Sequence, residues 1–269
     1  MRRTGGRVAL LTLVAGGFAF LYLPLIVLVL FSFNASKLVS VWGGWSVKWY
    51  GELLRNEQVL MAAWLSIKIA VINATGATLL GTMAGLALAR FGRFGGRLLF
   101  TGLIAAPLVM PDVIIGISLL LTFVSMEQLI GWPAGRGVDT ILIAHITFST
   151  AFVAVVVQAR AGGLDRSIEE AAMDLGARPL TAFLLVTLPM LAPALASGWL
   201  LAFTLSLDDL VIASFASGPG SSTLPMVIFS KVRLGVTPEI NALATLLIGA
   251  VALAAGGATW VQIRRMSRG

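Results

Sequence analysis

The amino-acid sequence predicts an all-α membrane protein with six spanning helices. Of the 269 residues, 58% are hydrophobic and only 12% are charged, against about 25% charged residues in an ordinary soluble domain. The apolar residues gather in six stretches, each near the roughly 20 residues that a helix needs to cross a bilayer core of about 30 Å. Because these stretches lack the alternating pattern of membrane barrel strands, we expect helices.

The expected spans follow one another along residues 1–269, which indicates a single membrane domain. Their approximate ranges are 8–33, 64–89, 98–124, 140–157, 192–215 and 240–261. The first span follows three arginines, as the core of a signal peptide would. It is too long for such a core, however, and no clear small-residue cleavage site follows it. We therefore expect an uncleaved first helix.

The distribution of Lys and Arg predicts the orientation. With the N-terminus inside, twelve of these residues lie in cytoplasmic segments, six in external segments and one, Lys68, within a span. Cytoplasmic loops carry the excess of Lys and Arg in membrane proteins, so we expect both termini in the cytoplasm. The net charge of +7 follows from this topology. No zinc spacing or aromatic–basic module indicates a nucleic-acid partner.

The long segment between the fourth and fifth spans is predicted to contain a short helix outside the membrane. Ser167 precedes Glu170 by three residues, the spacing of a capping box in which each side chain bonds the other residue's backbone amide. Gly176 is placed to end the helix in the left-handed conformation. Ala171 and Ala172 would let another surface approach closely, although an ordinary surface helix is the alternative.

This segment, about residues 160–190, resembles the EAA loop of permease subunits in bacterial ABC importers. The resemblance rests on Glu170-Ala171-Ala172, Gly176, Val186 and Leu188-Pro189, with Val186 where the family has isoleucine. In that family the short helix docks in a cleft of the cytoplasmic ATPase and transmits its closure to the pore. The resemblance implies a type I ABC importer permease fold and an ATPase-coupling role for Glu170, Ala171, Ala172 and Gly176.

Further motifs along nearly the whole chain look like the polyamine branch, and most like the second permease subunit of putrescine importers. They are Phe31-Ser-Phe-Asn34, Trp49-Tyr50, Pro107-Leu-Val-Met-Pro-Asp112, Leu205-Ser-Leu-Asp-Asp209, Ser217-Gly-Pro-Gly220, Thr223-Leu-Pro-Met226 and Glu239-Ile-Asn-Ala-Leu-Ala-Thr245. This likeness implies a bacterial inner membrane assembly. Its partners would be a homologous second permease subunit, two cytoplasmic ATPase subunits that bind the ATP, and a periplasmic polyamine-binding protein.

Four charged residues fall within the expected spans: Lys68, Asp112, Asp208 and Asp209. Such charges are costly in a bilayer and indicate function by default. With a rise of about 1.5 Å per residue, all four lie in the outer half of the membrane. In one interpretation Lys68 pairs with an aspartate, which reduces the cost of burying either charge. In the other, the surplus of acids lines the pathway of a polyamine dication.

The aspartates are not expected to act alike. Adjacent helical residues point about 100° apart, so Asp208 and Asp209 should not both face the same pore. Asp112 follows Pro111 and alternatively caps a helix that restarts there. His145 is the only histidine and is predicted to make an interhelical hydrogen bond, because a proton relay would require acidic partners nearby.

An aromatic cluster in the first external loop contains Trp42, Trp45, Trp49 and Tyr50. Aromatic faces attract ammonium groups, which would place Trp45, Trp49 and Tyr50 on the substrate pathway. An interfacial belt that holds the helix ends is the alternative, and contact with the binding protein is a third. Glycines 76, 81 and 85 in the second span are expected to permit close helix contact.

The chain lacks the residues that ATP hydrolysis or metal chemistry would need. It contains no Gly-x-x-x-x-Gly-Lys-Ser/Thr loop for phosphate, no cysteine and only one histidine. No nucleophile–base set is evident, so we expect no catalytic residue, metal or cofactor. Energy must come from a partner ATPase or from an ion gradient. The alternative function is therefore an ion-coupled secondary transporter or channel, which would predict inverted repeats or a carboxylate relay near the midplane.

Overall fold

The structure is a computed structural model that describes residues 3–38, 41–235 and 237–266. The regular elements of the described chain are helices, and one isolated antiparallel bridge joins Asn34 and Trp45. It forms two compact units, Met1–Leu60 with Ile228–Gly269, and Met61–Val227. Two helices, α3 (Glu57–Arg90) and α11 (Leu224–Leu234), contain residues of both units. The units are described separately below.

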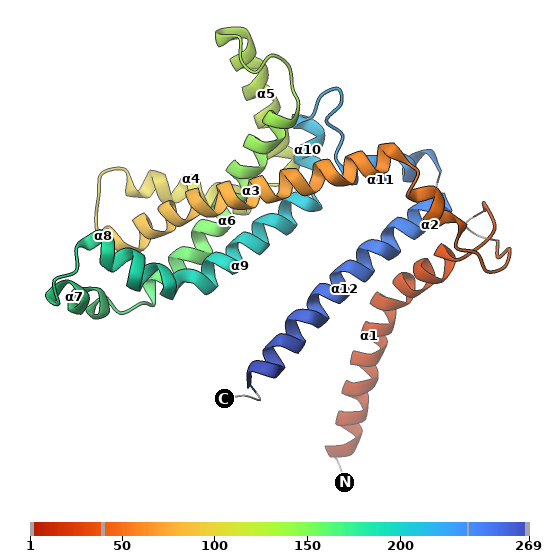
Figure 1. Cartoon of the computed structure of the whole chain (residues 1–269), viewed down its shortest axis with the longest axis horizontal. Helices are drawn as coiled ribbons and strands as arrows, with labels where there is room; N and C mark the ends of the chain where they lie inside the picture. Colours follow the sequence, from red (N-terminus) through yellow and green to blue (C-terminus); the bar gives the residue numbers. More distant parts are fainter. Residues whose placement is uncertain (1–2, 39–40, 236, 267–269) are drawn as a thin grey trace. The chain divides into compact units, whose positions relative to one another are not determined.

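The first unit is built on two long helices that lie side by side, α1 (Arg3–Ser32) and α12 (Pro238–Met266) (Figure 1). A short helix, α2 (Lys48–Leu53), packs against α12. Apolar side chains of α1 remain exposed within the chain, as a lipid-facing helix requires. At the start of α12, Glu239 accepts a hydrogen bond from Asn56 (2.6 Å) and pairs with Lys231 (3.2 Å).

The second unit holds the helices that matter for the sites below. Its long helices α6 (Val138–Gly162) and α9 (Leu188–Leu207) lie side by side and pack against α3 (Figure 1). The other elements are α4 (Arg97–Val109), α5 (Asp112–Ile130), α7 (Ser167–Asp174), α8 (Pro179–Ala182), the π-helix η1 (Phe183–Thr187) and α10 (Val211–Ala216).

Small residues bring α3 and α6 together. A Cβ atom added to Gly81 would lie 2.6 Å from the Cβ of Val153, and one added to Gly85 would lie 2.6 Å from the carbonyl oxygen of Ala154. The buried core beside them consists of Ala74, Ala77, Val153, Val157 and Ala202. The expected close helix contact at these glycines is confirmed, because any side chain there would separate the helices.

The third expected span was wrong as a single helix. Residues 98–124 are divided between α4 and α5, and the chain is extended at Met110 (ψ 138°) and Pro111 (ψ 138°). Proline has no amide proton and disfavours the helical conformation of the residue before it. The break therefore follows from Pro111, and α5 continues to Ile130, beyond the expected end.

The fifth expected span, 192–215, was also displaced. The helical segment starts at Pro179, runs through α8, η1 and α9, and ends at Leu207. Asp208 to Leu210 are not part of a regular helix, and α10 begins at Val211. The two aspartates therefore lie in a break between helices, and the helical spacing assumed for them does not apply.

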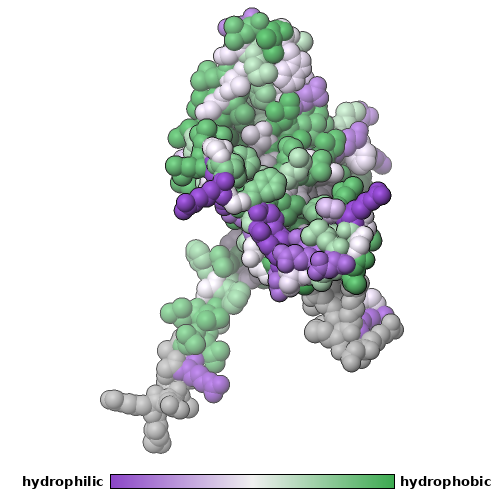
Figure 2. Space-filling model, turned by 90° about the vertical axis from the view of Figure 1, so that its left-hand side faces the viewer, coloured by the Kyte–Doolittle hydropathy of each residue, from purple (hydrophilic) through white to green (hydrophobic). Residues whose placement is uncertain are grey.

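Five helices among the described residues are long and apolar enough to cross a membrane. They are Leu10–Ser32, Glu57–Arg90, Asp112–Ile130, Val138–Gly162 and Pro179–Leu207. In α12 the described apolar part, Pro238–Leu253, is shorter, so a sixth span there stays a prediction. Figure 2 faces the α7 and α8 end of Figure 1 and shows a band of hydrophilic residues on a largely hydrophobic surface.

Candidate functional site

The short helix predicted between the fourth and fifth spans exists as α7, but its start differs from the expectation. Ser167 is the first helical residue, and its N–H donates to the Oδ1 of Asp165 (2.9 Å). The capping box between Ser167 and Glu170 was therefore wrong. An aspartate two residues upstream reaches the amide first, as Asp does in tight turns. The same hydrogen bond lowers the pKa of Asp165 below its usual value, because it stabilises the ionised carboxylate.

The end of α7 agrees with the expectation for Gly176. This glycine has a φ of +93°, which side chains other than glycine rarely adopt. Its N–H donates to the carbonyl of Met173 (2.9 Å), and the N–H of Ala177 donates to the carbonyl of Ala172 (3.1 Å). These two bonds form a Schellman motif, which satisfies the last carbonyls of the helix.

The outward surface of α7 is open to a partner. Glu170, Ala171 and Gly176 are exposed and Ala172 is half-buried, so all four residues of the expected coupling set reach the surface. No residue of α7 is buried. The helix presents small residues beside a carboxylate, which leaves room for another protein surface to approach its backbone.

The opposite side of α7 is tied to the membrane helices by Glu169, which sequence reasoning missed. Its carboxylate pairs with Nη1 of Arg90, the last residue of α3, at 3.0 Å. It also accepts a hydrogen bond from the hydroxyl of Thr187, the last residue of η1. Arg166 donates from Nη2 to the carbonyl of Arg90 (2.9 Å). The adjacent pair Glu169-Glu170 was the signal in the sequence. Neighbouring residues on a helix point about 100° apart, so the two glutamates could not be expected to have the same surroundings.

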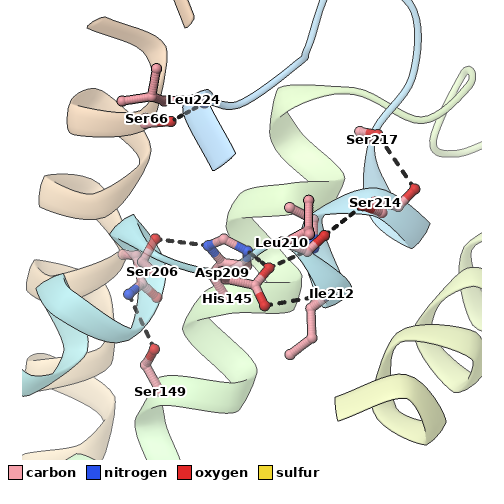
Figure 3. A network of polar contacts seen from close by, with 12 residues as sticks. Ser66, His145, Ser149, Ser206, Asp209, Leu210, Ile212, Ser214, Ser217 and Leu224 are labelled. Carbon is pink, nitrogen blue, oxygen red and sulfur yellow. Dashed lines mark hydrogen bonds and ion pairs between the residues drawn. The ribbon is translucent and has the colours of Figure 1, made fainter. Parts of the chain in front are cut away.

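At the other end of α9, His145 links α6 to α9 and to the segment that follows α9 (Figure 3). It lies on α6 with 2% of its surface exposed. Its Nδ1 hydrogen-bonds with the hydroxyl of Ser206 (2.7 Å) and its Nε2 with Oδ2 of Asp209 (3.1 Å). An ionised Asp209 carboxylate would only accept hydrogen bonds, and Nε2 would then be the donor in this pair. The predicted interhelical hydrogen bond is confirmed, and the acidic partner was not foreseen.

The carboxylate of Asp209 is used in hydrogen bonds within the chain. Besides the bond from His145, its carboxylate accepts the backbone N–H groups of Ile212 (3.3 Å) and Ala213 (2.7 Å) at the start of α10. These contacts explain why the chain leaves α9 and begins a new helix here. Its side chain is only 12% exposed, which leaves little of the carboxylate for a ligand.

Asp208 differs from its neighbour. It is exposed, and within the described chain its carboxylate makes no hydrogen bond or ion pair with another side chain. It lies close enough to Asp112, the exposed first residue of α5, and to Asp209 for electrostatic interaction. Asp112 begins α5 as expected, although it makes no capping hydrogen bond. The breaks in the two expected spans therefore leave these two exposed carboxylates within range of electrostatic interaction.

Lys68 does not neutralise these acids. Its Nζ lies over the ring of Trp64, 5.0 Å from the centroid. No carboxylate of the described residues lies within ion-pair distance of it. Of the two interpretations, the pairing of Lys68 with an aspartate is therefore contradicted. A lysine on an exposed helix surface reaches the aromatic face one turn away more easily than a carboxylate on another element.

The aromatic residues of the first unit have unequal environments. Trp49 is 5% exposed and donates from Nε1 to the carbonyl of Asn34 (2.6 Å). The hydroxyl of Tyr50 hydrogen-bonds with that of Ser32 (2.6 Å). Trp45 is 71% exposed and packs edge-on against Trp42, with centroids 5.0 Å apart. Trp49 and Tyr50 hold the loop to α1, whereas Trp45 presents a free face.

A cluster of metal-ligating side chains is absent from the described residues.

Comparisons with known proteins agree with this geometry. Residues 77–265 match the family model "Binding-protein-dependent transport system inner membrane component". The chain is 60% identical over 266 residues to the putrescine transport system permease protein PotI of Escherichia coli (strain K12), covering 99% of this chain and 93% of that one. It is 43% identical over 241 residues to the spermidine/putrescine transport system permease protein PotC of the same strain, covering 88% and 89%.

Solved structures show the same fold. A chain in the crystal structure of a bacterial ABC transporter that imports the acidic polysaccharide alginate superposes with a TM-score of 0.73. The identity is 18%, and the match covers 97% of this chain and 98% of that one. An amino acid ABC transporter gives a TM-score of 0.56 at 17% identity, covering 81% and 98%.

Proposed function

The chain belongs to the family of binding-protein-dependent transport system inner membrane components, and from this premise we propose that it is a permease subunit of an ATP-driven importer of putrescine. It is a pore subunit and not an enzyme, and the ATPase is a separate chain. The observation that carries the substrate is the 60% identity, over nearly the full length of both chains, to a putrescine permease.

The coupling role rests on the geometry of α7. Glu170, Ala171 and Gly176 are exposed and Ala172 is half-buried, while Glu169 anchors the helix to α3 and η1. We propose that the surface with these exposed residues docks on a cytoplasmic ATPase subunit, which binds and hydrolyses ATP. Closure of the ATPase dimer would then move α7, and α7 would move the membrane helices.

The substrate pathway rests on the two exposed carboxylates. Putrescine carries two ammonium groups, and Asp208 and Asp112 are the acids left free to meet them. We propose that these two line the pathway and that Asp209 holds the segment containing Asp208 in place through its hydrogen bonds. Trp45 offers an exposed aromatic face for a cation, and Trp49 and Tyr50 hold its loop in place.

The proposed assembly contains two such permease subunits, this chain and a homologous partner, with two ATPase subunits and a periplasmic polyamine-binding protein. The loaded binding protein docks outside, ATP closes the ATPase dimer, and the spans open outward. Putrescine passes the acidic layer and leaves inward after hydrolysis. The chain would sit in a bacterial inner membrane with six spans, α12 being the last, and with both termini in the cytoplasm.

The orientation can be tested directly because the chain has no cysteine. Lys37 and Arg93 are both exposed and lie on opposite sides in the proposed topology. A membrane-impermeant maleimide added to spheroplasts should label Lys37→Cys and not Arg93→Cys until the membrane is opened. The reverse pattern would overturn the orientation.

The function itself is tested by uptake of radiolabelled putrescine and spermidine into proteoliposomes that contain the reconstituted complex and its binding protein. We expect uptake of putrescine only with ATP on the ATPase side. Uptake of neither polyamine, or equal uptake without ATP under an ion gradient, would overturn the proposal.

A further inference from the structure

We propose that Glu169, Arg90 and Thr187 form the joint through which α7 moves the membrane helices. The three are positioning residues, and their role rests on the proposed coupling to an ATPase. The juxtaposition is one carboxylate on the cytoplasmic helix, held at once by the last residue of α3 and the last residue of η1.

Packing alone does not hold α7 in place. The helix has eight residues and none is buried. Isolated helices shorter than about 12 residues are marginal in water. Beside it lies a cavity of about 360 Å³, lined mainly by apolar side chains such as Leu86, Met173 and Phe183. A helix that rests beside a cavity is positioned by its few polar attachments.

The polar contacts of α7 with α3 converge on one residue, Arg90. The guanidinium of Arg90 pairs with Glu169, and the carbonyl of Arg90 accepts a hydrogen bond from Arg166. The Nε of Arg90 is buried and has no hydrogen-bond partner among the described residues. The side chains of Arg90 and Glu169 are only 15% and 26% exposed, so water screens their attraction less than it would at an open surface.

Thr187, the other partner of Glu169, connects α7 to α9. Thr187 is 2% exposed and ends a π-helical turn that leads directly into α9. Such turns contain an extra residue and are frequent at functional sites. Because Glu169 accepts from Thr187, a displacement of α7 acts on α9 as well as on α3. Both helices pack against α6, so the displacement reaches the core of the unit.

The joint is chemically distinct from the docking surface. Glu170 is exposed on the proposed docking surface, whereas Glu169 is bonded to Arg90 and Thr187. Loss of Glu170 should weaken the association with the ATPase, but loss of Glu169 should leave that association intact and break the transmission. These two outcomes separate failure of the joint from failure of the proposed coupling surface.

The test measures putrescine transported per ATP hydrolysed by the full complex in proteoliposomes. Glu169→Gln and Arg90→Gln should each lower this ratio by about 5-fold or more, the low end of coupling between distant sites. Complex assembly and basal ATP hydrolysis should remain. The exchange of charges, Glu169→Arg with Arg90→Glu, should restore most of the ratio.

Thr187→Val keeps the shape of the side chain and removes its donor, so it provides a milder second variant. It should lower the ratio even if the charge variants fail to assemble. The matched control is Glu239→Gln, which breaks the Lys231–Glu239 ion pair of similar length and burial outside α7 and should leave the ratio unchanged. Wild-type ratios in assembled Glu169→Gln and Thr187→Val complexes, or an exchange variant as defective as the single ones, would overturn the joint.

Discussion

Replacement of Asp209 and of Asp208 by alanine should have opposite consequences although the residues are neighbours. The Asp209 carboxylate accepts hydrogen bonds from His145, Ile212 and Ala213, while Asp208 is exposed. Asp209→Ala should therefore destabilise the protein. Asp208→Ala should leave the stability unchanged and impair putrescine uptake.

The magnitude follows from the contacts that are lost. Removing a carboxylate that caps the first amides of a helix costs about 0.5–2 kcal/mol. The buried Nε2 of His145 would also lose its hydrogen-bond partner, at about 1–3 kcal/mol. Together the loss is about 1.5–5 kcal/mol for Asp209→Ala. For Asp208→Ala the change should stay within about 0.5 kcal/mol, as for an exposed residue without partners.

The assay pairs thermal unfolding of the purified complex with uptake of radiolabelled putrescine. We expect a Tm several degrees lower for Asp209→Ala and an unchanged Tm for Asp208→Ala. Asp208→Asn should raise the KM or abolish uptake at an unchanged Tm, because it removes one negative charge and little volume. An equal loss of stability in both alanine variants, or wild-type uptake by Asp208→Asn, would refute this division of roles.

The remaining predictions concern glycines and the cap of α7. Gly176→Ala should cost about 1–2 kcal/mol locally, since an L-residue is strained at a left-handed φ, and should lower transport per ATP; Gly162→Ala, in a helical conformation with open space, is the control and should transport normally. Gly85→Leu should lower the Tm of the complex by forcing α3 away from Ala154 on α6, while Gly102→Leu, where the space is open, should not. Asp165→Ala should increase tryptic cleavage in the loop of α7 in inside-out vesicles, and Asp165→Asn, which keeps an acceptor, should not. Because the pKa of Asp165 is lowered, the stability that its ionised carboxylate gives to the start of α7 is complete above its usual pKa of 3.8. This stability is lost only as the pH falls through the lowered pKa. Cleavage that varied with titration of Asp165 between pH 6 and 8 would contradict the role of Asp165 as the cap of α7.

Much of the fold could be predicted from the sequence because it depends on local composition. A bilayer requires long apolar helices, and five of the six expected spans overlap one. Gly176 is another local case, since the left-handed end of a short helix calls for glycine. The helix breaks were harder to place. Pro111 indicated a disturbance, but whether a proline kinks or ends a helix depends on what its neighbours contact.

The candidate functional sites also depend partly on local sequence and partly on tertiary packing. The sequence by itself determined that a short helix ending at Gly176 carries the Glu170-Ala171-Ala172 motif, because that motif is contiguous along the chain. Only the tertiary structure decided that Glu169 meets Arg90 and Thr187, and that Asp209 bonds His145 while Asp208 stays exposed. The partners in these contacts lie up to 79 positions apart. The physical reason is that a carboxylate serves equally well as a helix cap, an ion-pair partner or a cation site. Its role is set by the donors that packing brings within hydrogen-bonding distance.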